Sequence, residues 1–341
     1  MIKIISILIA VLISASLMDT RTEAVSWIAT DVVIGDVNYD GFLNNDDISI
    51  IVNSKIPTGI SKTLTKLTAS QKEIADINRN GIIDSKDVEI LTNIYKDNLT
   101  PYEVKMIYNI ETNFKTKTIS MGDGFISPVA AGIDVSVWQG IIDWDTVADT
   151  GISFAIIRAG YGTMEDNGED IRFKENINEA KKHGLNVGIY WYSYATTPEE
   201  AIKEADACYK MIKGEQLQYP VFFDIEEERQ VELGTEVCSQ MINAFCDRIT
   251  SYGYYLGIHT YASFLNECVD QEIKDKYDIW FADYLLVETK IVNYYGDYQM
   301  WQYTSIGYSE GIYDDLDLDY CYKDYPYIME KYKLNDGKPN Y

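Results

Sequence analysis

From residue 131 onward, short apolar runs typical of strands alternate with stretches of helical periodicity. The first five runs are GIDVS (132–136), FAIIRA (154–159), NVGIYWYSY (186–194), PVFFDIE (220–226) and YLGIHT (255–260), and the helical patterns between them cover 143–150, 170–183, 198–213 and 235–252. This alternation predicts parallel strands joined by crossover helices. Three more runs follow with little helical pattern between them: DIWFADY (278–284), YQMWQYT (298–304) and DLDLDY (315–320). We therefore expect an α/β fold, an irregular (β/α) barrel of eight mainly parallel strands with few late helices; an open doubly wound sheet is the alternative.

Residues 1–24 have the pattern of a secretory signal peptide. Lys3 provides a positively charged start, residues 4–17 are a mainly apolar run, and TEA (22–24) ends on a small residue suited to cleavage. The apolar run is shorter than the roughly 20 residues that a membrane-spanning helix needs. We therefore expect a secreted, extracellular protein; a retained membrane anchor is the alternative.

Two twelve-residue segments repeat in the region that follows. DVNYDGFLNNDD (36–47) recurs as DINRNGIIDSKD (76–87), with side-chain oxygens on alternate residues, glycine at position 6 and an acid at position 12. Calcium-binding loops need this spacing, with one more ligand from the backbone carbonyl of position 7. We predict two structural Ca²⁺ ions; two acidic turns without metal are the alternative. The predicted ligands are Asp36, Asn38, Asp40, Phe42 and Asp47 in the first loop, and Asp76, Asn78, Asn80, Ile82 and Asp87 in the second.

The repeat differs from a pair of EF-hands in two respects. Position 12 is aspartate, where EF-hands usually carry glutamate, and no amphipathic helix precedes the first loop. A duplicated loop followed by a helix, over residues 31–97, resembles the dockerin family. The resemblance implies a small all-α calcium-binding domain that binds a cohesin domain of a scaffolding protein, in a cell-surface enzyme complex. Positions 10 and 11, which help to select the cohesin in that family, differ between the loops, so we expect unequal halves.

The remaining segments complete the expected domain organisation. Within the connector 98–130, the stretch YEVKMIYNIETNFKTKTIS (102–120) alternates apolar and polar residues in places, which favours a hairpin resting on the next domain. The barrel is expected over 131–325, and 326–341 is expected to be a tail.

The composition narrows the choice of partners and chemistry. Among 341 residues, 54 are acidic and 29 basic, so the formal net charge is −25. This excess disfavours nucleic acid and anionic membranes as partners, since both attract clustered basic residues. Five cysteines without a CxxC motif and only two histidines disfavour a disulfide scaffold and zinc sites. His259 ends a predicted strand, where it either lines a pocket or packs in the core.

Acidic residues gather at the predicted ends of barrel strands, where barrel enzymes place their chemistry. Asp134 ends the first strand, and Asp317 lies in the eighth. Asp224 and Glu226 end the fourth strand two residues apart, so their side chains share a face. Neighbouring buried carboxyls raise one pKa, and the retained proton suits general acid cleavage of a glycosidic bond. Individually, such acids can instead cap helices or bind metals.

Seven segments of this region together resemble glycoside hydrolase family 25, the lysozymes that cleave the β-1,4 bond between N-acetylmuramic acid and N-acetylglucosamine. They are GIDVSVWQG (132–140), FAIIRAGYG (154–162), VGIYWYSYA (187–195), PVFFDIE (220–226), IWFADY (279–284), MWQYT (300–304) and DLDLDY (315–320). The resemblance implies Glu226 as general acid, with Asp134, Asp224 and Asp317 around the reacting sugar, and no cofactor in the barrel. It also implies asparagine where Asp319 stands. We place six further residues at the substrate: Tyr161, Tyr192, Trp280, Asp283, Tyr284 and Gln302.

The combined hypothesis is a secreted peptidoglycan hydrolase, a glycosidase of the lysozyme (N-acetylmuramidase) type, attached to a scaffold by its dockerin. Two retaining mechanisms stay open, one with a carboxylate nucleophile and one assisted by the N-acetyl group of the substrate. The DxE motif of Asp224 and Glu226 resembles families that use the second. Two alternative functions remain: a hydrolase of chitin or another N-acetylhexosaminide, and a non-catalytic wall-binding protein, which the intact set of acids disfavours.

Overall fold

The computed structural model describes residues 34–38, 43, 45–55, 67–97, 99–110, 128–163, 165, 168–284 and 296–335. They belong to two compact units, Met1–Thr116 and Lys117–Tyr341, each of which is described by itself. The predicted signal peptide (1–24) and the first-loop ligands Asp40 and Phe42 lie outside the described residues. Within the described ranges, no helix has the length and apolar character needed to cross a membrane.

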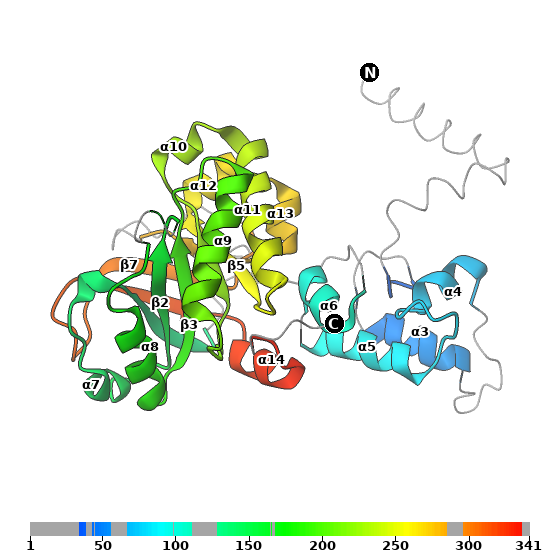
Figure 1. Cartoon of the computed structure of the whole chain (residues 1–341). Helices are drawn as coiled ribbons and strands as arrows, with labels where there is room; N and C mark the ends of the chain where they lie inside the picture. The colour runs from blue at the N-terminus through cyan, green and yellow to red at the C-terminus, as the bar shows by residue number, and fades with distance from the viewer. Residues whose placement is uncertain are drawn as a thin grey trace, which may run out of the picture. The chain divides into compact units, whose positions relative to one another are not determined.

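The described part of the first unit is built from helices. They are α3 (Asn45–Lys55), α4 (Ala69–Ala75), α5 (Ser85–Lys96) and α6 (Pro101–Tyr108) (Figure 1). Helices α3 and α5 begin at the ends of the two predicted calcium loops and pack against each other. Ile90, Leu91 and Ile94 are buried on α5, at the spacing of one helix face, and Ile51 is buried on α3. Each loop is therefore followed by a helix that contributes to a shared core, as the repeat predicted.

Helix α6 occupies part of the stretch for which the sequence favoured a hairpin. The Thr100 hydroxyl accepts a hydrogen bond from the Glu103 N–H (3.3 Å), and the Glu103 carboxylate accepts one from the Thr100 N–H (2.7 Å). This reciprocal cap, with Pro101 at the start of the helix, satisfies N–H groups that a helix start leaves unpaired. The hairpin is therefore wrong for Pro101–Tyr108, and residues 111–127 lie outside the described residues.

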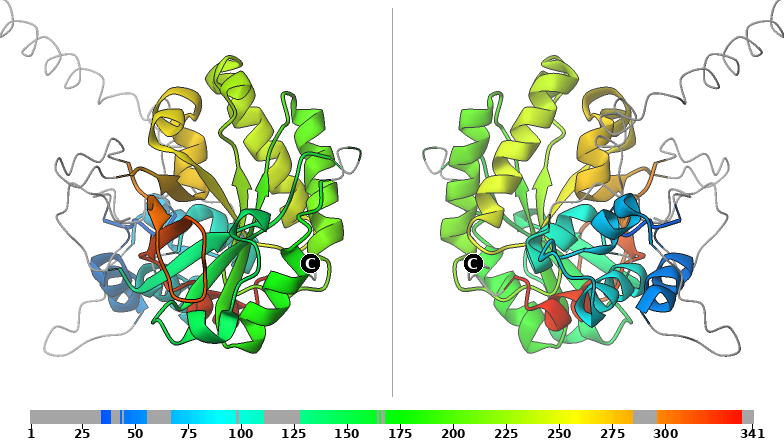
Figure 2. Two further views of the ribbon diagram at one scale, coloured as in Figure 1. Left: turned by 90° about the vertical axis from the view of Figure 1, so that its left-hand side faces the viewer. Right: turned by 90° about the vertical axis from the view of Figure 1, so that its right-hand side faces the viewer.

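The second unit is a closed barrel of eight strands (Figure 2). In chain order they are β1 (Ala130–Val135), β2 (Phe154–Tyr161), β3 (Asn186–Tyr192), β4 (Val221–Asp224), β5 (Leu256–Tyr261), β6 (Asp278–Ala282), β7 (Met300–Gly307) and β8 (Leu316–Cys321). Neighbouring strands are parallel from β1 through β7, whereas β8 runs antiparallel to both β7 and β1. The expected barrel of eight mainly parallel strands is confirmed, and the open sheet is excluded.

Helices follow the early strands, and within the described residues few lie between the late strands. They are the 3-10 helix η2 (Val137–Gln139), α7 (Trp144–Ala148), α8 (Phe173–Lys182), α9 (Pro198–Ile212), α10 (Glu228–Val231), α11 (Gly234–Thr250), α12 (Ala262–Cys268) and α13 (Gln271–Lys276). The connection from β7 to β8, residues 308–315, contains no helix. A parallel crossover needs a dozen or more residues, so this short connection permits only an antiparallel strand. The length of the connection thus explains the reversal of β8.

The chain after β8 continues into helix α14 (Tyr325–Tyr332), which packs on the barrel. The buried ring of Tyr325 lies 5.3 Å from the ring of Tyr219, which precedes β4. The Asn335 amide donates a hydrogen bond to the Tyr219 carbonyl (2.8 Å) and accepts one from the Tyr255 N–H before β5. The expectation of a tail after residue 325 is therefore wrong as far as Asn335, because these residues cover the amino-terminal ends of two strands.

A buried ion pair ties β6 to the segment between β8 and α14. The Lys323 ammonium lies 2.9 Å from the Asp278 carboxylate, which also accepts a hydrogen bond from the Tyr255 hydroxyl (2.7 Å). Replacing Lys323 with methionine keeps most of the unbranched side chain but removes the ammonium group that faces the buried Asp278. We expect the unfolding free energy of the barrel to fall by about 3–5 kcal/mol. The matched change Lys203→Met, on the exposed side of α9, should cost less than about 0.5 kcal/mol. Urea denaturation measures both, and equal losses would contradict a stabilising ion pair.

Candidate active site

Four predicted catalytic acids come together at one rim of the barrel. Asp134 is the penultimate residue of β1, Asp224 is the last residue of β4, and Glu226 follows two residues later. Asp317 is opposite Asp134 in the antiparallel β1–β8 register. Because β8 is reversed, its beginning lies at the rim where the parallel strands end. Asp317 therefore joins the other acids from the start of its strand.

Asp134 is buried beside two other acids. Burial raises its pKa well above the usual value, and the charges of Asp317 and Asp319 raise it further. The Gln302 amide opposes this shift by donating a hydrogen bond to Asp134 Oδ2 at 2.7 Å. Burial also raises the pKa of Asp317, to about 6. Asp134 and Asp317 therefore retain protons at a pH where exposed aspartates are ionised.

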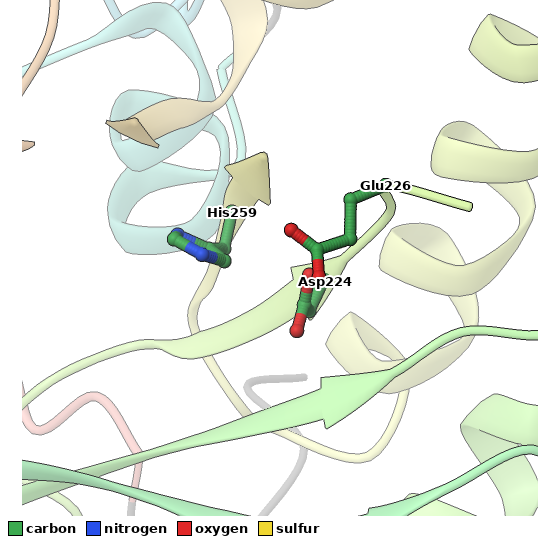
Figure 3. A group of neighbouring side chains, drawn as sticks. All are labelled: Asp224, Glu226 and His259. Carbon is green, nitrogen blue, oxygen red and sulfur yellow. The ribbon is translucent and has the colours of Figure 1, made fainter. Parts of the chain in front are cut away.

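Asp224 and Glu226 lie at the end of β4, and His259 of β5 lies beside them (Figure 3). Asp224 and His259 are partners in the β4–β5 register, and the Ile225 N–H donates to the His259 carbonyl (3.0 Å). One donor atom from each of the three side chains lies within 4.8 Å of the other two. Burial raises the pKa of both carboxyls, and the Glu226 charge raises that of Asp224 further. The pair therefore keeps a proton toward neutral pH, as general acid catalysis requires.

Polar neighbours distinguish the two carboxyls of this pair. The Arg158 guanidinium lowers the pKa of Asp224, while its Nε donates to Asp170 Oδ2 at 2.8 Å. Among the described residues no cation lowers the pKa of Glu226; the charge of Glu227 raises it, and the nearby Tyr192 hydroxyl, whose proton is donated to Glu227 (2.8 Å), lowers it. A positive charge favours the ionised form of the nearer carboxyl. Burial opposes this effect, because Asp224 is the more deeply buried of the two and its pKa stays well above the usual value. Glu226 is the more exposed carboxyl, so it is the one that can present a proton to a bound substrate.

Five of the six predicted substrate residues lie at or next to the rim. The rings of Tyr161 and Tyr192 are 5.9 and 5.3 Å from the ring of Tyr194, and all three keep exposed surface. The hydroxyl of the exposed Tyr284 donates to Gln302 Oε1 (2.8 Å). Nε2 of the same Gln302 amide donates to Asp134 Oδ2. These residues can therefore border a substrate bound over the acids. The fifth, Asp283, follows β6 and keeps part of its surface exposed.

The prediction that Trp280 contacts substrate is wrong. Its side chain is fully buried, its indole N–H donates to Asp319 Oδ1 (2.8 Å), and its ring lies 3.8 Å from the ring of His259. The alternation of β6 turns this residue into the barrel, where no sugar can stack on it. Trp280 instead supports two polar residues beneath the rim.

His259 is the residue that the sequence left undecided between pocket and core. Burial lowers its pKa to about 3, so the ring is neutral. Its Nδ1 lies 3.2 Å from the Trp280 carbonyl oxygen, which accepts a hydrogen bond when the ring proton is on Nδ1.

Glu227 also lies at the site, although the sequence did not predict it. Its carboxylate accepts a hydrogen bond from the Tyr192 hydroxyl (2.8 Å). The one signal for Glu227 was its position next to Glu226, whereas His259 was visible as a polar residue in an apolar strand.

The second predicted calcium loop is described completely. Asp76 accepts hydrogen bonds from the N–H groups of Asn80 (3.1 Å) and Gly81 (2.7 Å), and Asp87 accepts one from Asn78 (3.2 Å). Gly81 has a φ of +84°, which only glycine adopts without strain. These hydrogen bonds bend the chain around the side chains of positions 1 and 12. The resulting set of carboxylate and amide oxygens fits Ca²⁺.

The first loop repeats this construction where it is described. Asp47 accepts a hydrogen bond from the Asn38 N–H (3.3 Å), as Asp87 does from Asn78 in the second loop (3.2 Å). Asp47 and Asp87 are both completely buried. Burial of a carboxylate is costly unless cations or donors surround it, so both positions suit a metal ligand.

Comparison with known proteins identifies both parts of the chain. Residues 133–312, more than half of its length, match the family described as Glycosyl hydrolases family 25. The chain belongs to glycosyl hydrolase family 25. Residues 34–94 match the Dockerin type I domain, so both resemblances seen in the sequence are confirmed.

Two curated relatives of this family 25 protein are bacterial lysozymes. It is 29% identical over 191 residues to the autolytic lysozyme of Clostridium acetobutylicum, which covers 55% of this chain and 54% of that protein. It is 30% identical over 198 residues to lysozyme M1 of Streptomyces globisporus, covering 54% of this chain and 65% of that protein. The chain thus spans between half and two thirds of the length of these relatives. A family 25 glycosyl hydrolase from Bacillus anthracis has the same fold at 20% identity, with a TM-score of 0.50 over 61% of this chain and 94% of that one.

Asp319 stands where the family 25 resemblance implies asparagine. Burial raises its pKa well above the usual value, the Trp280 hydrogen bond opposes this shift, and the charge of Asp317 adds to it. The pKa of an aspartate in the unfolded chain is about 3.9. Between that value and the higher folded pKa, the folded protein binds more protons than the unfolded chain. Ionising Asp319 therefore lowers the stability of the barrel as pH rises through this window.

We expect Asp319→Asn to raise the Tm of the family 25 barrel by an amount that grows from about pH 4 to about pH 7. Asparagine keeps an oxygen to accept the Trp280 hydrogen bond and removes the ionisable group. Each kcal/mol gained should raise Tm by roughly 2–4 °C. Thermal unfolding across this pH range measures the effect, with Asp275→Asn on the exposed side of α13 as the control. A Tm difference that shrinks as pH rises would contradict the expectation.

Proposed function

We propose that the barrel is an N-acetylmuramidase, which cleaves the β-1,4 bond between N-acetylmuramic acid and N-acetylglucosamine in peptidoglycan. The observation that carries the proposal is the pair of Asp224 and Glu226, with donor oxygens within 4.8 Å of each other and both pKa values raised by burial. The names of the two curated relatives, autolytic lysozyme and lysozyme M1, support the class of substrate.

Glu226 acts as the general acid in this proposal. Its raised pKa keeps a proton on the carboxyl, and the proton passes to the glycosidic oxygen as the bond to the anomeric carbon breaks. Arg158 favours the ionised form of Asp224 rather than of Glu226. After the leaving sugar departs, the Glu226 carboxylate accepts a proton from the water that attacks the anomeric carbon.

Asp224 orients the N-acetyl group of the sugar whose glycosidic bond is cleaved. Its Oδ1 is buried and has no hydrogen-bond partner among the described residues, so it can accept the N–H of the substrate amide. The amide oxygen then attacks the anomeric carbon, and water opens the resulting oxazolinium ring with overall retention of configuration. Asp317, whose pKa of about 6 leaves it largely ionised at neutral pH, stabilises the positive charge that develops on the sugar, and its register partner Asp134 borders the same sugar.

The identity of the sugar at the new reducing ends tests which glycosidic bond the protein cleaves. Purified peptidoglycan is digested with the protein, the new reducing ends are reduced with borohydride, and the fragments are identified by mass spectrometry. We expect N-acetylmuramitol at every new end. N-acetylglucosaminitol would show that the other glycosidic bond is cleaved, and solubilisation without new reducing ends would exclude a glycosidase.

We also propose that the dockerin region binds two structural Ca²⁺ ions and a cohesin domain of a scaffolding protein outside the cell. The paired construction of the two loops supports the metal sites, with Asp47 and Asp87 as the carboxylates of position 12. Bound Ca²⁺ would add positive charge beside these buried carboxylates. The signal-like pattern of residues 1–24 supports secretion.

A further inference from the structure

The rim of the barrel contains a cluster with the donor atoms of a transition-metal site. Asp224 and Glu226 offer carboxylate oxygens and His259 an imidazole nitrogen, each within 4.8 Å of the other two (Figure 3). Over the described ranges of the chain, this is the one group of three such side chains that converges in this way. Two carboxylates and one imidazole can occupy one side of a metal ion and leave other positions open.

The backbone holds two of the three ligands in a defined relation. Asp224 and His259 are register partners on the parallel strands β4 and β5, so their side chains leave the sheet side by side. The hydrogen bond from the Ile225 N–H to the His259 carbonyl continues this pairing one residue further, toward Glu226. Ligands carried by paired strands need little reordering to meet one ion.

Nδ1 of His259 has a backbone carbonyl as its partner, as the non-ligating nitrogen of a metal-binding histidine often does. Nδ1 lies 3.2 Å from the Trp280 carbonyl oxygen, and the Trp280 ring packs against the imidazole with centroids 3.8 Å apart. A metal-ligating histidine almost always donates its other N–H to a carbonyl or carboxylate, which orients the ring. With the proton on Nδ1, Nε2 presents its lone pair to a ligand.

Asp224 provides an independent indication that something binds here. Its side chain is only 3% exposed, and its Oδ1 has no hydrogen-bond partner among the described residues. A buried carboxylate oxygen without a donor is costly, and a cation at this point would remove the cost.

We propose that Asp224, Glu226 and His259 bind a divalent transition-metal ion of the zinc type, and that the bound ion blocks the active site. The imidazole nitrogen favours zinc and its neighbours over Ca²⁺ and Mg²⁺, which prefer oxygen ligands. Bonds to zinc of about 2.0–2.2 Å require the three donors to move closer together. The half-buried Glu226 side chain, which follows the end of β4, can supply this movement by rotation.

Metal binding and proton donation exclude each other at this site. The ion bonds to one oxygen of each carboxylate and to Nε2, and the proton of the carboxyl pair is released to solvent without any change in oxidation state. Glu226 then has no proton for the glycosidic oxygen, and Asp224 cannot accept the substrate amide. The inhibition rests on the proposed function, whereas the binding of the ion does not.

Calorimetric titration with ZnCl₂ tests the site on the full chain, with excess Ca²⁺ present to saturate the dockerin loops. His259→Gln should weaken zinc binding at least about tenfold. The chain has one other histidine, His183 at the end of α8, so His183→Gln is the matched control and should bind zinc as the unaltered protein does. Asp224→Asn is a second variant that removes a different ligand and should also weaken binding.

Inhibition is then measured as the ratio of wall-lysis rates with and without zinc for the unaltered protein and the two histidine variants; Asp224→Asn is used for binding alone, because Asp224 belongs to the catalytic pair. We expect zinc to inhibit the unaltered protein and His183→Gln reversibly, with at least about tenfold more zinc needed for His259→Gln. Equal zinc affinity in all four proteins would overturn the proposal, and so would loss of binding in His183→Gln alone. If the unaltered protein binds zinc through His259 but hydrolyses no peptidoglycan without zinc, the proposed function fails and the metal site stands.

Discussion

Glu226→Gln is expected to lower kcat for peptidoglycan hydrolysis by about 10²–10⁴-fold, with little change in the Tm of the barrel. Glutamine has nearly the same shape as glutamate but carries no acidic proton. The leaving sugar would then depart as an unprotonated alkoxide, which raises the barrier of the first step. Because Glu226 is half-buried after the end of β4 and is not part of a strand, the substitution should leave the barrel folded.

The leaving group provides a sharper test of the role of Glu226. A substrate with a nitrophenolate leaving group needs no protonation, so Glu226→Gln should retain much more of its activity on such a substrate than on peptidoglycan. Glu228→Gln, on the exposed side of α10, is the matched control and should change either rate by less than about twofold. Wall lysis by Glu226→Gln at the unaltered rate would refute the assignment of the general acid.

Removal of calcium is expected to unfold the dockerin region and abolish cohesin binding, while the barrel stays intact. Asp47 and Asp87 are buried at the ends of their loops, next to helices α3 and α5 that share a core. Without a cation, the like charges of each loop repel one another, and metal binding is coupled to folding in sites of this kind. Hydrogen exchange with and without chelator measures the effect in the full chain: protection of α3 and α5 should be lost, and that of β1–β8 retained.

Two variants on α5 distinguish the loss of a metal ligand from the loss of any carboxylate on that helix. Asp87→Ala removes a predicted ligand, whereas Glu89→Ala removes an exposed carboxylate whose contact is an ion pair with Lys86 (3.1 Å). We expect Asp87→Ala to reduce the protection of α5 even in calcium, and Glu89→Ala to behave as the unaltered protein does. Protection of α3 and α5 that is unchanged after complete removal of calcium would contradict the two metal sites.

Spacing along the chain was sufficient to predict several features of this protein. The predicted ligands of each proposed calcium loop lie within twelve consecutive residues, so their pattern is complete in the sequence. The alternation of strand and helix predicted the barrel, and the two-residue spacing of Asp224 and Glu226 placed both carboxyls on one face. In each of these cases, the interactions that define the feature are local, within one loop, one helix or one strand.

The positions of the other site residues depend on pairing between strands that are far apart in the sequence. The short connection after β7 reverses β8, which brings Asp317 to the rim from the beginning of its strand. The β4–β5 register places His259 beside Asp224, and closure of the barrel buries Trp280. Neither the burial of a side chain nor its distance to an acid on another strand is encoded in local periodicity. Both depend on contacts between residues far apart in sequence, and those contacts exist only once the barrel has closed.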